Sequence, residues 1–414
     1  MHSLSQGVFM KKAKLCLCVL IVVFCLLVQS TYCCSMELAE KESPKTATGF
    51  EVSAPSALLM EASSKTILYE KNAKEKMRPA SVTKIMTLLL IFDAIKENKI
   101  SYEDIATTSA YAASMGGSQV FLEEGEVQTV RDLIKCISIC SANDACVVMA
   151  ELIGGTEEHF VEMMNQRAKE LGMENTNFVN CCGLEAEGHL TCAYDIALMS
   201  QELITKHPEI FEYCTIWMDT ITHHTRKGDT VFGLTNTNKF LRSYSHATGL
   251  KTGYTSASKY CLAATAEKDG LQMIAVVMAE ENPKQRTKDV IALCDYGFSN
   301  CKLYQDTPKL PKTKIPVHKG KQEKLSYSIE KPFEYLFTDV TKLGEITRKI
   351  ILPKEVKAPI QKGDAIGSVR YYLGEEEIGT LPIVAEHTIA KQNFFDFFKQ
   401  TLGRLFFKNS GASS

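Results

Sequence analysis

The stretch Arg78-Pro79-Ala80-Ser81-Val82-Thr83-Lys84 opens a helical pattern on which the interpretation of the whole chain depends. Because proline is favoured at a helix start, the pattern predicts a helix over residues 81–95 with Ser81 in its first turn. Lys84 then lies on the same helix face, within reach of the Ser81 hydroxyl. The alternative is that Ser81 only caps the helix. The prediction of this helix is based on apolar residues at the i, i+3, i+4 spacing, namely Ile85, Leu88, Leu89, Phe92 and Ile95.

A serine and lysine placed in this way can form a nucleophile and its base. A serine hydroxyl attacks poorly without an adjacent base. Lysine is such a base only in its neutral form, which burial or a neighbouring cation such as Lys251 favours. The pair needs no histidine, and the chain contains neither Gly-x-Ser-x-Gly nor His-Glu-x-x-His. We expect no metal and no cofactor, and we interpret His223-His224 as a solvated turn.

Two further short motifs follow in the chain, Ser141-Ala142-Asn143 and Lys251-Thr252-Gly253. The first lies between two apolar helical runs, so its turn can carry a hydroxyl and an amide into a cleft, although simple helix capping is an alternative. The second precedes a hairpin signal at Asp269-Gly270. A strand containing glycine lets a substrate backbone lie alongside, and Lys and Thr side chains can hold a carboxylate. Each motif alone is weak, as Ser-x-x-Lys also starts at Ser256, Ser299 and Ser328.

The rest of the chain predicts two folded parts. Strand-like and helical runs alternate over residues 54–300, with hairpins at 57–70 and 260–277, further helix within 127–152 capped by Thr129, and a closing helix at 289–298. Short β-like runs follow a proline- and lysine-rich linker at 307–312. We therefore expect an α+β domain followed by a small all-β domain.

Composition excludes several classes of protein. The 414 residues are 45% apolar and 23% charged, which is ordinary for a globular chain rather than a disordered one. The net charge of −2 provides no global basic field, so we expect no nucleic-acid partner. Ten of the 15 cysteines lie between Cys136 and Cys301 without a disulfide framework. We interpret these ten mostly as small buried apolar residues.

Both ends of the chain carry segments of their own. A basic stretch and an apolar run over residues 15–28 indicate a signal peptide at 1–35, because the run is shorter than the roughly 20 residues that span a bilayer. An uncleaved membrane anchor is the alternative. Residues 388–414 hold an aromatic face and a net positive charge, which predicts an amphipathic helix on a membrane surface. Docking of that aromatic face on the β domain is the alternative.

In their order, the three motifs are those of penicillin-binding proteins and class A β-lactamases. The chain resembles the low-molecular-mass D-alanyl-D-alanine carboxypeptidases of bacterial cell-wall synthesis (serine peptidase family S11). The likeness extends to residues 121–125, Gly183–His189 and Lys251–Thr255. It implies the penicillin-binding-protein/β-lactamase-like transpeptidase fold, an antiparallel sheet flanked by helices plus an all-helical subdomain, followed by a small all-β domain. It implies a catalytic domain at 36–305, the β domain at 306–387, and an exported enzyme at the outer face of the cytoplasmic membrane.

The resemblance also implies a role for each motif residue. The substrate would be a peptidoglycan stem peptide ending in D-Ala-D-Ala, whose penultimate carbonyl acylates Ser81, and β-lactams would be covalent inhibitors. Lys84 would be the general base, and Ser141 would relay protons to the leaving amine. Backbone N–H groups of Ser81 and Tyr254 would form the oxyanion hole. The substrate-binding residues would be Asn143, Lys251, Thr252, Gly253 and Tyr254.

Two other functions compete with this one. A secreted β-lactamase would share the fold, but it needs a deacylating carboxylate, and residues 175–184 hold no Glu-x-x-x-Asn. A non-catalytic scaffold of the cell wall would share the fold without the chemistry. The family's pattern departs here only at Ala142, where glycine is common. No motif identifies an arginine for the substrate carboxylate, although Arg242 is near in sequence.

Overall fold

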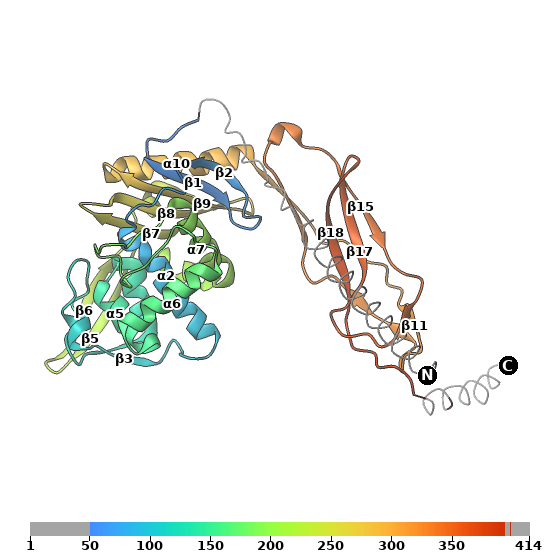
Figure 1. The fold of residues 1–414 in the computed structure, drawn as a ribbon, viewed down its shortest axis with the longest axis horizontal. Coiled ribbons are helices and arrows are strands. Elements are labelled where there is room, and N and C mark those ends of the chain that lie inside the picture. Colours follow the sequence, from blue (N-terminus) through green and yellow to red (C-terminus); the bar gives the residue numbers. More distant parts are fainter. Residues whose placement is uncertain (1–49, 394–397, 399–414) are drawn as a thin grey trace, which may run out of the picture. The chain divides into compact units, whose positions relative to one another are not determined.

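The computed structural model describes residues 50–393 and residue 398, and an antiparallel five-stranded sheet organises its N-terminal domain. The strand order is β2-β1-β9-β8-β7 (Figure 1). The expected hairpins are confirmed, since β1 pairs with β2 and β8 pairs with β9. The strands are β1 (Ser56–Glu61), β2 (Ile67–Lys71), β7 (Ala247–Thr255), β8 (Lys259–Lys268) and β9 (Leu271–Glu280).

Helices cover both faces of this sheet. Helix α10 (Pro283–Asn300) packs on one face, and α7 (Ala193–Lys206) and α2 (Lys84–Lys96) lie on the other (Figure 1). Because side chains alternate along a strand, Leu58 contributes to the α2 and α7 core while Leu59 contributes to the α10 core. The closing helix is longer than predicted because Asn282 caps it, accepting a hydrogen bond from the Gln285 N–H.

The tight turn between β8 and β9 has the expected cause. Asp269 and Gly270 have φ angles of 52° and 78°, the left-handed conformations that a two-residue hairpin of this type needs. Gly270 adopts this conformation without steric cost. The turn therefore sets the register of β8 against β9, and β8 pairs with β7 along its other edge.

A second, mainly helical part lies between β2 and β7 in the chain. The predicted helix at 81–95 begins with a 3₁₀ turn, η1 (Ala80–Thr83), before α2. Thr129 caps α4 (Val130–Lys135) as expected, accepting from the Asp132 N–H. A π-helical segment, η2 (Cys136–Cys140), then leads to α5 (Asn143–Gly154) and α6 (Glu157–Glu170). The expected helical part thus exists, with a break at Ser141, whose φ is 61°.

A four-stranded sheet borders the helices, and it corrects the interpretation of His223-His224. Its strands are β3 (Ile105–Thr107), β4 (Val127–Thr129), β5 (Met218–Thr225) and β6 (Gly228–Thr235). Both histidines lie within β5, so the predicted solvated turn is wrong. His223 is buried and hydrogen-bonded to Glu126 at 2.7 Å, because alternate residues of the strand face inward. His224 faces solvent beside Asp229.

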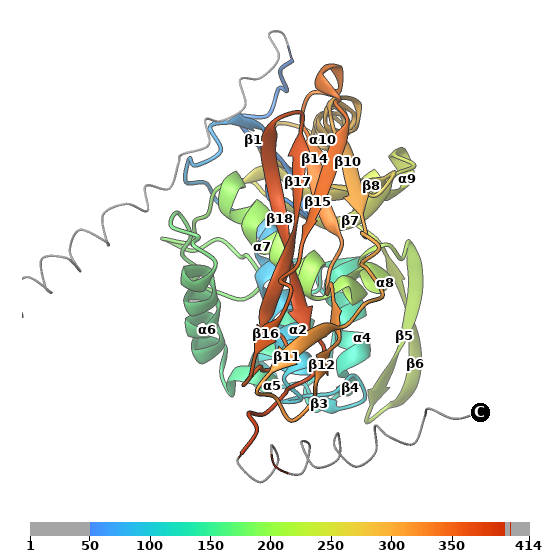
Figure 2. The same cartoon turned by 90° about the vertical axis from the view of Figure 1, so that its right-hand side faces the viewer.

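The C-terminal domain is all β, as predicted. Its longest strands, β15 (Ile346–Ile351), β17 (Ala365–Leu373) and β18 (Glu376–Ala385), lie side by side (Figure 2). The Tyr371 ring stacks on Phe333 at 3.7 Å in the centre of the domain. The shorter strands are β10 (Lys302–Asp306), β11 (Ile315–His318), β12 (Lys324–Leu325), β13 (Tyr327–Ser328), β14 (Phe333–Phe337) and β16 (Val356–Lys357).

The C-terminal domain extends beyond the expected boundaries of 306 and 387. Strand β10 pairs with β14, so the domain already begins at Lys302. Ile389 is buried in the domain and exchanges backbone hydrogen bonds with Ile360.

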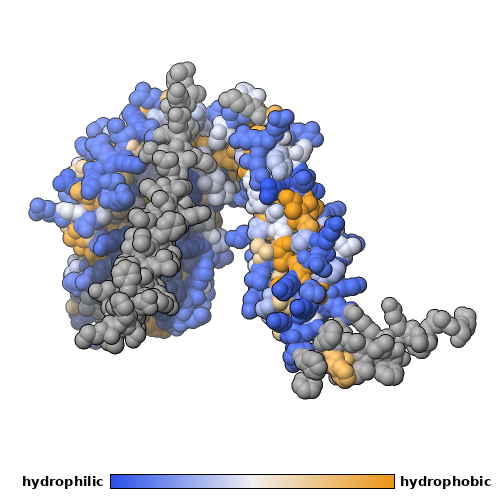
Figure 3. Space-filling model, turned by 45° about the vertical axis from the view of Figure 1, so that its right-hand side comes forward, coloured by the Kyte–Doolittle hydropathy of each residue, from blue (hydrophilic) through white to orange (hydrophobic). Residues whose placement is uncertain are grey.

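Apolar side chains also reach the surface of this domain (Figure 3). Among them, Ile351 on β15 is 38% exposed.

The cysteines of the described residues are free thiols. All ten are buried except Cys140, which is half-buried, so the interpretation as small buried apolar residues is confirmed for them. Within residues 50–393, no helix combines the length and apolarity that crossing a bilayer requires. The signal peptide predicted at 1–35 and the membrane-surface segment from residue 394 onward, apart from Phe398, lie outside the described residues.

Candidate active site

Ser81 stands on the short turn that precedes α2. Lys84 is the first residue of α2, is fully buried, and places its Nζ 3.0 Å from Ser81 Oγ. Within the described residues, Ser81 provides no side-chain cap to η1 or α2, so the capping alternative is not supported. The helical spacing therefore brings these two groups together as the sequence predicted.

Lys84 Nζ has two further acceptors, both on other segments. It donates to Asn143 Oδ1 at 2.7 Å and to the Cys182 carbonyl at 2.6 Å. The Asn143 amide is oriented by its Nδ2, which donates to the Gly116 carbonyl at 2.7 Å. Since a lysine ammonium has three donors, the three contacts use its whole capacity. Lys84 is thus held in one position from three directions.

Ser141 forms a second polar pair with Lys251. Lys251 Nζ on β7 donates to Ser141 Oγ at 2.9 Å and to the Thr252 carbonyl at 3.0 Å. Burial, and next the charge of Lys84, hold the pKa of Lys251 well below its usual range. Among the described contacts, neither Ser141 nor Asn143 caps α5. Instead, the Ser141 side chain contacts Lys251 and the Asn143 side chain contacts Lys84.

Gly253 lets β7 lie against the turn that carries Ser81. A Cβ at this position would lie 2.9 Å from the Pro79 carbonyl oxygen, closer than real Cβ atoms come, and 3.1 Å from Val82 Cγ2, which is a tight contact. The next residue, Tyr254, is 53% exposed, and its ring stacks on Tyr260 at 4.3 Å. The Thr252 hydroxyl lies 2.9 Å from that of Thr237. The structure thus assembles all eight residues of the predicted site on η1, α2, the α5 turn and β7.

His189 is a residue of this region to which the sequence assigned no role. Its Nδ1 accepts a hydrogen bond from the Val179 N–H at 3.0 Å, so Nε2 carries the proton and donates to Thr83 Oγ1 at 2.8 Å. The Thr83 hydroxyl in turn donates to the Ala80 carbonyl at 2.8 Å. Burial lowers the pKa of His189 to about 4. A neutral imidazole therefore supports the turn that presents Ser81.

Arg286 on α10 is a second residue that the sequence did not single out. Its guanidinium is buried, donates to the Cys261 carbonyl at 3.3 Å, and lies 5.7 Å from the centre of the Tyr260 ring. Its charge contributes to the low pKa of Lys251. Its buried Nε has no hydrogen-bond partner among the described residues. Arg242, by contrast, is exposed and stacks on Trp217 at 5.2 Å.

Fold and site together define the class of serine acyl-transfer enzymes with a lysine beside the nucleophile, and comparison with known proteins gives the family. The D-alanyl-D-alanine carboxypeptidase family model (Peptidase_S11) matches residues 40–282, and that of the penicillin-binding protein 5 C-terminal domain matches residues 298–391. The chain belongs to the S11 D-alanyl-D-alanine carboxypeptidases. This confirms the predicted family, fold class and enzyme class.

Individual relatives cover most of the chain. D-alanyl-D-alanine carboxypeptidase DacF of Bacillus subtilis is 40% identical over 366 residues, which span 88% of this chain and 92% of that protein. DacA of Escherichia coli is 31% identical over 359 residues, with 83% and 86% covered. The crystal structure of penicillin-binding protein 5 from Haemophilus influenzae has a TM-score of 0.67 and 27% identity, covering 83% of this chain and all of that one. These relatives favour neither the β-lactamase nor the scaffold alternative.

We predict that His189 makes the stability of the fold depend on pH. The pKa of His189 falls from an ordinary 6.5 to about 4 in the folded chain, so between these values only the unfolded chain binds the proton. The free energy of unfolding should therefore be highest above pH 6.5 and fall by up to about 3 kcal/mol as the pH drops to 4. Urea unfolding across this range, with the wild type compared with His189→Asn, measures the effect.

His224 provides the matched control, because it is exposed on β5. His224→Asn should keep the pH dependence of the wild type, whereas His189→Asn should be less stable at pH 7 and lose much less stability towards pH 4. Equal slopes for His189→Asn and the wild type would contradict the assignment of a buried neutral imidazole.

Proposed function

We propose that the protein removes the terminal D-alanine from peptidoglycan stem peptides that end in D-Ala-D-Ala, through an acyl-enzyme on Ser81. The observation that carries this proposal is the 3.0 Å contact between Lys84 Nζ and Ser81 Oγ. It also rests on the family to which the chain belongs. β-Lactams, which carry a reactive amide in place of the D-Ala-D-Ala bond, would acylate the same hydroxyl.

Lys84 is the general base of the acylation step in this proposal. A neutral amine can donate two hydrogen bonds and accept one. With Asn143 Oδ1 and the Cys182 carbonyl as acceptors, its lone pair is left for the Ser81 proton. Ser81 Oγ then bonds to the penultimate D-Ala carbonyl carbon. The oxyanion that forms accepts hydrogen bonds from the backbone N–H groups of Ser81 and Tyr254. Such donors contribute about 10²–10³ each in rate.

Ser141 and Lys251 would complete the reaction on the other side of the peptide bond. Ser141 passes a proton to the leaving amine of D-alanine as the carbon–nitrogen bond breaks. Lys251, whose Nζ lies 2.9 Å from Ser141 Oγ, stabilises that hydroxyl. The proton that Lys84 took from Ser81 replaces the one that Ser141 gave up, so Lys84 is neutral again for deacylation. Water then attacks the ester on Ser81, and its proton returns to the serine oxygen as the shortened peptide leaves.

The terminal carboxylate of the substrate would bind at the β7 end of the site. Thr252 offers a hydroxyl that already lies near Thr237 Oγ1, and Lys251 supplies positive potential when protonated. Arg286 adds a buried cation behind Tyr260, and its Nε has no hydrogen-bond partner within the part of the chain that the structure describes. Because hydrogen bonds to charged groups contribute about 1.5–3 kcal/mol, we assign Arg286 to binding of this carboxylate.

The first prediction from this mechanism is that penicillin labels Ser81 alone. Intact-protein mass spectrometry should find one adduct per chain, and peptide mapping should place it on Ser81. Ser81→Ala should lose the adduct and lower the release of D-alanine at least about 10³-fold, since removal of a catalytic nucleophile costs that much or more. Ser256→Ala is the control, because Ser256 is exposed and also begins a Ser-x-x-Lys pattern. An adduct elsewhere would overturn the mechanism.

The second prediction concerns recognition of the carboxylate. Arg286→Gln should raise KM for a peptide ending in D-Ala-D-Ala about tenfold or more, the equivalent of a lost charged hydrogen bond. The variant should differ little from the wild type on the same peptide with an amidated C-terminus. Arg242→Gln serves as the control with both peptides. An equal loss on both peptides would show that Arg286 acts only through the fold.

We further propose that the protein works outside the cytoplasmic membrane. The basic and apolar N-terminal segment supports export through a signal peptide, and the stem-peptide substrate lies in the cell wall. Residues 394–408 carry the aromatic and basic composition of a membrane-surface helix, which would hold the enzyme close to its substrate.

A truncation tests the membrane contact of this tail. Because Ile389 belongs to the β domain, the chain should end after Asn393, so that the folded part stays intact. We expect the truncated protein to leave the membrane pellet in cell fractionation while Ser81 still binds penicillin. A truncated protein that stays in the pellet, with its mature mass showing that residues 1–35 are removed, would contradict the proposal.

A further inference from the structure

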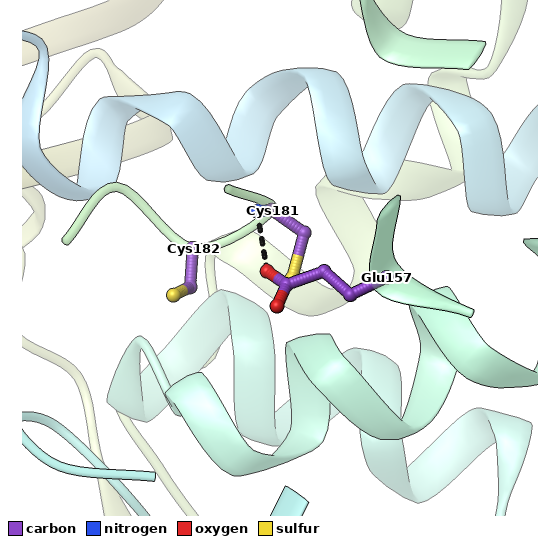
Figure 4. A group of neighbouring side chains, drawn as sticks. All are labelled: Glu157, Cys181 and Cys182. Carbon is purple, nitrogen blue, oxygen red and sulfur yellow. Dashed lines mark hydrogen bonds between the residues drawn. The ribbon is translucent and has the colours of Figure 1, made fainter. Parts of the chain in front are cut away.

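Two thiols and a carboxylate lie together behind Lys84 and take no part in the proposed reaction. Cys181 and Cys182 are neighbours in the segment before Gly183, and Glu157 is the first residue of α6. Both Sγ atoms and a Glu157 carboxylate oxygen lie within 4.8 Å of one another. Figure 4 shows the Cys181 thiol beside the Glu157 carboxylate. All three side chains are buried.

Hydrogen bonds fix the carboxylate in this position. The Cys181 backbone N–H donates to Glu157 Oε1 at 2.9 Å, and the Tyr111 hydroxyl donates to Oε2 at 2.7 Å. The first turn of α6 adds the positive end of the helix dipole, which favours a negative charge. Two hydrogen bonds leave further lone pairs on the carboxylate, so Glu157 can still act as a ligand.

We propose that Glu157, Cys181 and Cys182 bind one thiophilic divalent cation of the zinc type. Zn–S and Zn–O bonds of about 2.3 and 2.0–2.2 Å place neighbouring ligand atoms of a tetrahedron roughly 3.3–3.8 Å apart. Because the three atoms already lie within 4.8 Å of one another, binding would require them to draw together by at most about 1–1.5 Å. A water molecule would be the fourth ligand. Each cysteine that binds releases its thiol proton to solvent.

The charges around the cluster suit such a cation. Two thiolates and one carboxylate exceed the charge of a divalent cation by one negative unit. The protonated form of Lys84 would compensate this charge, since its Nζ lies 2.6 Å from the Cys182 carbonyl, and that form cannot act as the base proposed above. In a buried site, this compensation matters more than at the surface.

Cation binding should be sensed at the catalytic lysine, and this part of the inference rests on the proposed function. The carbonyls of the two cysteines hold α2, because Cys182 accepts from Lys84 Nζ and Cys181 accepts from Thr87 Oγ1 at 2.5 Å. Movement of the thiols towards Glu157 shifts the peptide groups that carry these carbonyls. We therefore expect the bound cation to slow acylation of Ser81.

Direct measurement of binding tests the site. The full chain, reduced and treated with a chelator, is dialysed against Zn²⁺ or Cd²⁺, and bound metal is counted by elemental analysis while cadmium–thiolate absorption is recorded. We expect affinity to fall at least tenfold in Glu157→Gln, Cys181→Ser and Cys182→Ser relative to the wild type. Cys294→Ser is the matched control, because Cys294 is buried on the other face of the sheet, in the α10 core.

The outcomes separate the site from the proposed function. Unchanged affinity in all three variants, or no binding by the wild type, would overturn the site. Thermal unfolding of each metal-free variant checks its fold. If a cysteine variant fails to fold, Glu157→Gln, which keeps the side-chain size, is the variant that tests the site. Penicillin labelling several-fold slower with Zn²⁺ in the wild type than in Glu157→Gln supports the link to Lys84, and equal rates overturn that link. Failure of the metal-free wild type to label would instead count against the proposed function.

Discussion

The position of the Lys84 amine is the constraint on which the rest of the site depends. Its Nζ contacts the Ser81 hydroxyl, the Asn143 side chain and the Cys182 carbonyl, which come from three separate segments. Loss of any of these partners would leave the buried amine with one hydrogen bond fewer. The turn before α2, the start of α5 and the segment at 181–183 must therefore be packed together before the site exists.

Close packing also positions the segments that lie against the turn of Ser81. Gly253 brings β7 against the turn of Ser81, because a side chain there would collide with the Pro79 carbonyl. The segment at 181–189 approaches the same turn from another side, where a Cβ on Gly183 would lie 1.9 Å from the Ala80 carbonyl oxygen. His189 then supports the turn through Thr83. Ser81 thus stands on a backbone turn that neighbouring segments hold on two sides.

Some residues of the candidate site could not be found from the sequence, for a physical reason. His189 and Thr83 are 106 residues apart in the chain, and no periodic pattern connects them. Arg286 lies on α10, and only the order of the strands brings it close to the end of β7. The error at His223 has the same origin, since its burial depends on the pairing of β5 with β6 and on Glu126. The alternation of exposed and buried residues over 218–225 exists only once the strand has formed.

The sequence by itself determined the features that arise between near neighbours. Helical spacing placed Lys84 beside Ser81, the Asp269-Gly270 pair specified its hairpin, and Thr129 specified the start of α4. The order of three motifs also sufficed for the family. Only the tertiary structure decided that Lys251 meets Ser141, 110 residues away, and that Glu157 meets the two thiols behind Lys84. Local conformation follows from backbone geometry over a few residues, whereas these contacts follow from how whole helices and strands pack.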